Sequence, residues 1–265
     1  VRLHSVDNSA TTIPSLDGSA FASQQSIAFV DDLTLVAITQ RNRVSIFKND
    51  GEAGRPLSGL EGIPLAVTTS RNQALIAAGD DEGNVVVWNA SNGDIQAKLK
   101  SELPAVSYLS FNDDGSLLAV AGSSADPRIE VWDTMAQQKI QTLIGSQGAI
   151  PAMSFQPRGD LVAASDARGV LRLWNARDGQ LVHTMSATEE QTSFVSLAFT
   201  PDGNALATGA INGDIQFWDP KTGEQATLLR TGYDRVFALA FSPNGEILAV
   251  GSRDTTVRLL RLPSN

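Results

Sequence analysis

Residues 235–260 read RVFALAFSPNGEILAVGSRDTTVRLL and contain three short runs of strand-forming composition. The runs are Val236–Phe241, Ile247–Val250 and Val257–Leu260. A Pro-Asn-Gly sequence separates the first two runs, and a Ser-Arg-Asp sequence separates the last two. Turn residues of this kind between β-branched and aromatic runs are typical of antiparallel hairpins. The stretch therefore predicts three consecutive antiparallel strands.

The same pattern recurs six times along the chain. In its second run each copy has an alanine, and these are Ala37, Ala77, Ala119, Ala163, Ala207 and Ala249. In its third run each copy has an aromatic residue or a leucine, and these are Phe47, Trp88, Trp132, Trp174, Trp218 and Leu260. All four tryptophans fall in this second column. A repeat of about 40–45 residues is the period of a four-stranded propeller blade.

Each tryptophan is followed by Asp or Asn, in the pairs Trp88-Asn89, Trp132-Asp133, Trp174-Asn175 and Trp218-Asp219. Together with the Pro-Asp-Gly and Pro-Asn-Gly turns, these pairs resemble the WD-repeat β-propeller family over nearly all of residues 11–262. The resemblance implies a ring of four-stranded antiparallel blades that is mostly used as a binding platform. The family usually has a Gly-His pair before the first strand, which this chain lacks. We therefore expect its hydrogen-bond network with Ser, Asp and Trp to be largely absent.

The first strand of the last copy is apolar on both faces, which supports the same fold on physical grounds. An antiparallel sheet with one face in water alternates apolar and polar residues. A strand that is apolar on both faces needs cover on both faces, and radially stacked blades supply it. The class is therefore an all-β propeller.

The number of blades depends on the two chain ends. Thr11–Leu16 matches the segment after each tryptophan, which in the family is the outermost strand of a blade. We expect this segment to pair with the last inner strands, which would close a ring of six blades and remove its exposed edges. Val1–Ser5 resembles the third strand of a copy, so seven blades with one incomplete is the alternative.

The composition limits the partners. The formal net charge is −9 and the isoelectric point is near 4.7, which argues against nucleic acid or an anionic membrane and favours a basic protein or peptide. No run reaches the roughly 18 apolar residues of a membrane span. The absence of cysteine fits a reducing compartment, so we expect a cytoplasmic protein. The oligomeric state is left open.

No catalytic, metal or cofactor motif is present. The two histidines, His4 and His183, have no partner near them in the sequence, and there is no cysteine for a zinc or thiolate site. The acidic runs beginning at Asp31, Asp80 and Asp113 lack the spacing of a calcium loop. We therefore expect no cofactor, no metal and no enzymatic activity.

The candidate binding face consists of the segments that lead into the first strands and the turns between the second and third strands. In the family this end of the ring is the usual binding surface. Tyrosine and arginine are favoured contact residues in interfaces, so the strongest candidates lie in the last copy. The candidate residues are Tyr233, Asp234, Arg235, Arg253, Gln40, Arg41, Asp81 and Arg168.

These observations favour a single propeller domain, residues 1–265, that is a fragment of a longer protein and acts as a non-catalytic scaffold for a protein or peptide partner. One alternative is a sensor or regulatory domain of a larger signalling protein, such as a bacterial ATPase, kinase or protease. We base this alternative on the missing initial Met and on the additional strand-like segment Val1–Ser5. A propeller hydrolase with an axial metal or paired carboxylates is the less favoured alternative, because no ligands with diagnostic spacing occur.

Overall fold

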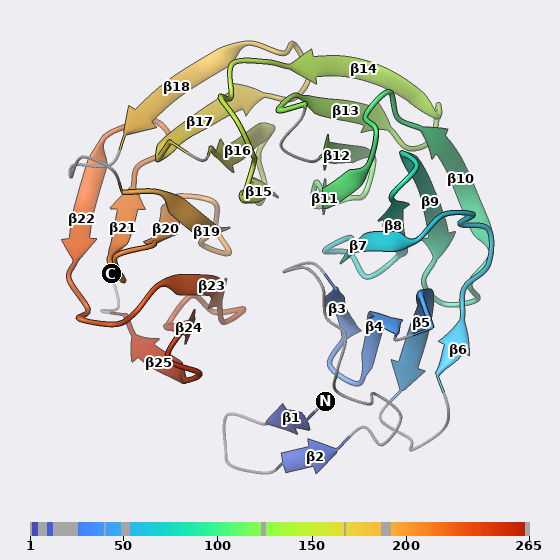
Figure 1. The fold of residues 1–265 in the computed structure, drawn as a ribbon, viewed down its shortest axis with the longest axis horizontal. Coiled ribbons are helices and arrows are strands. Elements are labelled where there is room, and N and C mark those ends of the chain that lie inside the picture. Colours follow the sequence, from blue (N-terminus) through green and yellow to red (C-terminus); the bar gives the residue numbers. More distant parts are fainter. Residues whose placement is uncertain are drawn as a thin grey trace.

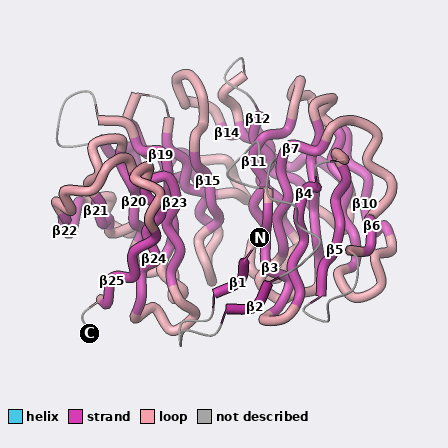
Figure 2. Tube along the Cα trace, turned by 60° about the horizontal axis from the view of Figure 1, so that its bottom comes forward, coloured by secondary structure: helices cyan, strands magenta, loops and turns pink. Residues whose placement is uncertain are grey.

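A computed structural model describes residues 2–4, 10–12, 26–39, 41–48, 54–122, 126–166, 168–186 and 192–262. Over these ranges, six antiparallel sheets are arranged around one axis as the blades of a propeller (Figure 1). Figure 2 shows that the strands run between two ends of the ring, where the loops gather. The described chain contains strands and loops but no helix. The predicted six-bladed all-β propeller is thereby confirmed.

The first three blades contain twelve strands among the described residues. The first blade comprises β3 (Ile27–Asp31), β4 (Thr34–Thr39), β5 (Arg43–Lys48) and β6 (Arg55–Pro56). The second comprises β7 (Pro64–Thr69), β8 (Leu75–Asp80), β9 (Asn84–Asn89) and β10 (Ile95–Lys100). The third comprises β11 (Val106–Phe111), β12 (Leu117–Gly122), β13 (Ile129–Asp133) and β14 (Gln138–Leu143).

The remaining blades follow in chain order. The fourth comprises β15 (Ala152–Phe155), β16 (Leu161–Ser165), β17 (Val170–Asn175) and β18 (Leu181–Ser186). The fifth comprises β19 (Phe194–Phe199), β20 (Leu206–Ala210), β21 (Ile215–Trp218) and β22 (Gln225–Leu229). The sixth comprises β23 (Val236–Phe241), β24 (Ile247–Ser252) and β25 (Val257–Arg261). A separate two-stranded sheet comprises β1 (Arg2–His4) and β2 (Ala10–Thr12).

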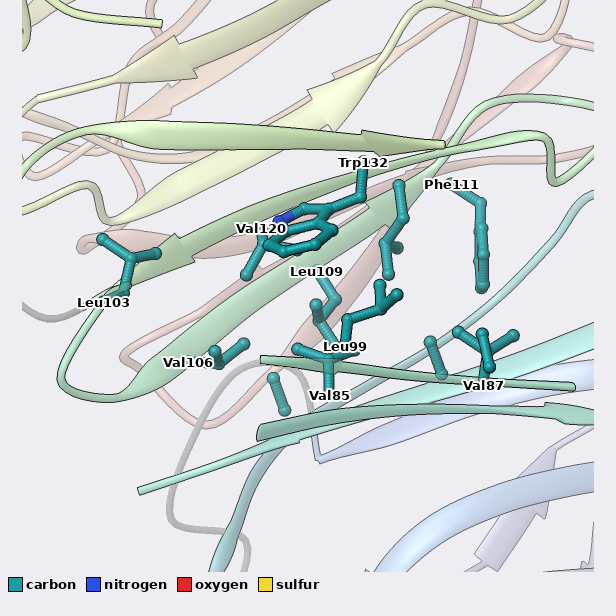
Figure 3. Close-up of a cluster of buried hydrophobic side chains, with 13 residues drawn as sticks. Val85, Val87, Leu99, Leu103, Val106, Leu109, Phe111, Val120 and Trp132 are labelled. Atoms are coloured by element: carbon teal, nitrogen blue, oxygen red, sulfur yellow. The ribbon is translucent and has the colours of Figure 1, made fainter. Parts of the chain in front are cut away.

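The core lies between neighbouring blades. Figure 3 shows Val85, Val87 and Leu99 of the second blade against Val106, Leu109, Phe111, Val120 and Trp132 of the third. Burying one such side chain stabilises the fold by about 1.5–3 kcal/mol. Each inner blade is covered in this way on both faces, so its strands can be apolar on both faces. The prediction of such cover is wrong for the strand on which it was based, because Phe237, Ala238 and Ala240 of β23 are exposed.

The four indole N–H groups find acceptors without the network that the family usually has. Trp88 and Trp174 donate to the backbone oxygens of Ser58 (2.8 Å) and Ile144 (3.1 Å). The Trp132 indole donates to a carboxylate oxygen of Glu130 (3.0 Å), and the Trp218 indole donates to the Thr208 hydroxyl (2.9 Å). Each buried indole therefore has an acceptor, which is a backbone carbonyl for Trp88 and Trp174 and a side-chain oxygen for Trp132 and Trp218.

The first blade departs from the predicted alanine column. In the second blade Ala77 faces the third blade, whereas Trp88 points the opposite way, toward the first. In the first blade Ala37 lies in the same cluster as Phe47, on one face. In the first blade the alanine column and the aromatic column are therefore offset by one residue relative to the other blades. A shift of one residue moves a side chain to the other face of a sheet, which is why Ala37 and Phe47 share a face.

The predicted closure of the ring is wrong for the described part of Thr11–Leu16. Thr11 pairs with Leu3 in the β1–β2 hairpin, and the sixth sheet has three strands in the part of the chain that the structure describes. Pairing with a strand nearby in the sequence closes a short loop, and a short loop costs less entropy than one that spans the whole chain.

The turns between the first and second strands of the fifth and sixth blades share one hydrogen-bonding scheme. The Ser242 hydroxyl donates to Asn244 Oδ1 (2.7 Å) and accepts from the amide of Ile247 (2.9 Å). The Thr200 hydroxyl bonds in the same way to Asp202 (2.6 Å) and, together with the amide and side chain of Asn204, lowers the pKa of Asp202 to about 2. A glycine with positive φ completes both turns.

Two of these turn glycines provide a matched test. At Gly245 (φ 75°) an added Cβ would meet only Pro201 Cδ at 3.6 Å, so Gly245→Ala is expected to cost about 1 kcal/mol through backbone strain alone. At Gly203 (φ 73°) the Cβ would also press on the Pro157 carbonyl of the fourth blade, with the carbonyl carbon at 3.3 Å. Gly203→Ala should therefore lose about 1–3 kcal/mol more in chemical denaturation. Equal losses would show that the two blades do not approach closely at this turn.

Candidate partner-binding face

The turns between second and third strands lie beside the segments that lead into the first strands. In the second blade the amide of Asp81 donates to the Ile63 carbonyl (3.0 Å). In the sixth blade the amide of Arg253 donates to the Arg235 carbonyl (2.9 Å). Both kinds of loop therefore occupy the same end of the ring.

The structure brings Tyr233, Asp234, Arg235 and Arg253 together at this end of the sixth blade. The carboxylate of Asp234 accepts from the amide of Arg235 (2.7 Å). The Ser252 hydroxyl donates to the Asp234 carbonyl (3.1 Å), which ties the leading segment to the end of β24. The backbone of the cluster is thus fixed by hydrogen bonds, while Asp234 and Arg253 are exposed.

Two further residues belong to the cluster, and sequence reasoning did not include them as binding residues. The Arg258 guanidinium lies 4.2 Å from the centre of the Tyr233 ring, within cation–π range. It also pairs with Asp254 at 2.7 Å. The Arg258 guanidinium, followed by the Thr256 hydroxyl, holds the pKa of Asp254 well below its usual range. In the sequence, the spacing of four residues between Asp254 and Arg258 is the feature that indicates this ion pair.

We call Tyr233, Asp234, Arg235, Arg253, Asp254 and Arg258 the blade-6 cluster. Positive groups outnumber negative ones in this cluster, whereas the whole chain has a formal net charge of −9. The cluster contains the guanidinium groups of Arg235, Arg253 and Arg258 and the carboxylates of Asp234 and Asp254. Because Arg258 is already paired with Asp254, the exposed Arg253 is the guanidinium most open to a partner's acceptor.

The other predicted residues lie on different blades. The exposed Asp81 accepts from the amide of Ile63 (2.7 Å), and Arg168 donates to the side chain of Gln147 (2.5 Å). Arg41 is exposed in the turn between β4 and β5. Gln40 lies outside the described residues. The structure therefore does not join these positions to the blade-6 cluster.

Two buried aspartates hold the loops of this face, and the sequence did not reveal this role. Asp80 accepts from the amide of Gly62 (2.9 Å) in the segment leading into its own blade. Asp166 accepts from the amide of Gln147 (3.2 Å) in the same way and also pairs with Arg172 at 2.5 Å. Each carboxylate thus cross-links the two kinds of loop that form the face, in place of the histidine network that the family usually has.

The described residues contain no group of three or more His, Asp or Glu side chains placed to hold a metal ion. They also include no helix of the length and apolar character needed to cross a membrane.

The family described as WD domain, G-beta repeat, matches residues 94–133, 137–175, 179–219 and 225–260. Each match ends in the third strand of a blade or directly after it. Together the four matches cover more than half of the chain.

Curated relatives match over part of the chain. The chain is 28% identical over 111 residues to nuclear distribution protein nudF 1 of Talaromyces marneffei, which covers 42% of this chain and 24% of that protein. It is 28% identical over 131 residues to an uncharacterized WD repeat-containing protein of Synechocystis, covering 49% and 37%. It is 28% identical over 102 residues to apoptotic protease-activating factor 1 of Rattus norvegicus, covering 38% and 8%.

A similar solved structure is the crystal structure of the computationally designed Ika8 protein. It superimposes with a TM-score of 0.73 at 22% identity, over 90% of this chain and 70% of that one. This likeness concerns the fold alone. The matches to the curated relatives extend over less than two fifths of each relative's own length.

Proposed function

Because the chain belongs to the WD domain, G-beta repeat family, we propose that it is a non-catalytic scaffold that binds a protein or peptide partner. The proposed surface is the end of the ring that carries the turns between second and third strands. The observation that carries the proposal is the blade-6 cluster, in which Tyr233 and Arg253 are presented on a hydrogen-bonded backbone. Tyrosine and arginine on a rigid support are the residues that most often dominate binding energy.

Two charge effects act on the partner at different ranges. The net charge of −9 favours the approach of a basic protein or peptide. At contact, the guanidinium groups of Arg235 and Arg253 favour a carboxylate or backbone carbonyls. We therefore propose a partner that is basic overall and places an acidic or carbonyl group on the blade-6 cluster.

Replacing Tyr233, Arg235 and Arg253 together with alanine is expected to weaken binding at least thirtyfold, because one such contact is worth about 2 kcal/mol or more. The experiment captures partners from the source cell with the unaltered chain, and then titrates each purified partner against both proteins.

A matched control removes two positive charges and one large side chain at the opposite end of the ring. It replaces Arg158, Met135 and Lys221, which lie in exposed turns, with alanine. Equal affinity of the unaltered and triply substituted chains for every partner would refute this face. Equal weakening by the control would show that the effect is not specific to it.

A second candidate function is that of a regulatory propeller within a longer chain. The observation in its favour is that the matching region makes up only 8% to 37% of the relatives described above. In this reading residues 1–265 are one domain of a cytoplasmic signalling protein. Sequencing the complete reading frame tests it, and a frame confined to these residues would count against it.

A further inference from the structure

The sixth blade has an apolar face that none of the described residues covers. Ala249 pairs with Leu259, and Gly251 pairs with Val257, so these residues share the face that points away from the fifth blade. Val257 is 73% exposed and Leu259 is 55% exposed. We call this surface the free face, and it consists of Ala238, Ala240, Ala249, Gly251, Val257 and Leu259.

The same positions are buried in the three blades before the fifth. The residues that correspond to Val257 and Leu259 are Val85 and Val87, Ile129 and Val131, and Leu171 and Leu173. All six are at most 1% exposed, because the next blade covers them. Residues suited to a blade–blade interface thus lie in contact with water in the sixth blade.

Gly79, Gly209 and Gly251 occupy equivalent positions in the second, fifth and sixth blades, and the first two show what normally packs there. A Cβ added to Gly79 would lie 2.6 Å from Cβ of Val106, in the first strand of the next blade. At Gly209 the added Cβ would lie 2.9 Å from Cβ of Val236, again from the next blade. At Gly251 the nearest described atom is Ala238 Cβ at 3.4 Å, within the same blade. The space over Gly251 therefore fits a β-branched side chain that is not supplied by the described residues.

The outer edge of the sixth blade is likewise unpaired among the described residues. In the other five blades the third strand pairs with a fourth, as β21 does with β22. Within the described ranges β25 pairs only with β24. In Figure 1 the next elements around the ring are β1 and β2, which form an antiparallel pair of their own.

We propose that the free face and the β25 edge together dock one further WD-type repeat segment. Its first strand pairs with β25, and the hairpin that follows covers the free face and places a valine-like side chain over Gly251. The occupant is a repeat of this kind rather than a second copy of the chain. A copy docking head to tail would have to use the outward face of its first blade, where Leu35, Ala37 and Phe47 are already buried.

The test appends a probe of known sequence. A copy of residues 219–252, which contains an outer strand and the Val236 hairpin, is fused after Leu260 in place of residues 261–265. The extended chain is expected to be more resistant to chemical denaturation, and the β25 amides are expected to exchange with solvent at least tenfold more slowly than in the original chain. Unchanged exchange at β25 would overturn the proposal.

A glycine substitution distinguishes docking from a general effect of the added length. Gly251→Val is expected to leave the original chain unchanged, because the site is open, and to abolish the gain in the extended chain, because the incoming valine cannot seat. Gly209→Val is expected to destabilise both chains. A gain that survives Gly251→Val would also overturn the proposal. So would a dimer of the original chain that Val257→Lys disrupts, because a second copy would then be the occupant.

Discussion

Replacing Asp166 with alanine is expected to lower the free energy of unfolding by about 3–5 kcal/mol, the range for leaving one member of a buried ion pair without its partner. Asp166 is fully buried and accepts from the amides of Arg168 (2.9 Å) and Val170 (3.1 Å). It also pairs with Arg172 at 2.5 Å. The alanine variant would leave these donors and a guanidinium without an acceptor. Equilibrium denaturation followed by circular dichroism measures the loss.

Two controls separate the contributions. Asp166→Asn keeps an acceptor oxygen but removes the charge, so its loss should be smaller. Adding Arg172→Met to Asp166→Ala removes the unpaired charge and should recover part of the stability, since a buried pair can be replaced by apolar groups at little cost. A double variant as unstable as the sum of the single variants would contradict the assignment of the loss to the ion pair.

The Glu130→Leu variant is expected to lose about 3–5 kcal/mol as well, because it removes a fully buried carboxylate that accepts from three groups. The donors are the hydroxyl of Ser101 (2.8 Å), the indole of Trp132 (3.0 Å) and the amide of Glu102 (3.2 Å). These bonds fasten the segment leading into the third blade to its third strand. The loss is measured by the same denaturation experiment.

The Glu130→Gln variant is the matched control, because its amide keeps the shape and one acceptor oxygen. We expect it to lose less than the leucine variant. Lys139, which lies 3.6 Å from Glu130, keeps a second carboxylate partner in Glu102 at 2.6 Å, so its charge stays paired in both variants. A leucine variant as stable as the unaltered chain would show that packing, not these hydrogen bonds, holds the segment.

The sequence predicts the parts of the fold that repeat. Six copies of one pattern give the number of blades, and the turn at Pro243–Gly245 predicts the first hairpin correctly. The sequence alignment assigns Ala37 to the wrong face of its blade, because the first blade has no Pro-Asp-Gly turn that would fix the alignment. A shift of one residue leaves the composition unchanged but reverses the face, so the pattern alone cannot detect it.

The candidate site is predicted only in part, for a similar reason. The meeting of Tyr233–Arg235 with Arg253 follows from blade topology, and backbone hydrogen bonds confirm it. The stacking of Arg258 on Tyr233 depends on side-chain geometry that no periodicity encodes. The role of Asp166 was missed because in the sequence it occupies a turn-like position, where aspartate is common in any case.

In the part of the chain that the structure describes, β1 pairs with β2 rather than with β25, so the described array of blades has two ends. Where each unit is stabilised mainly by its neighbours, the cooperativity of folding is that of a linear chain rather than of a closed circle. The terminal unit has one neighbour in place of two, so fraying starts there and spreads inward. A ligand that clamps the sixth blade would then slow the global unfolding rate as well as occupy a surface.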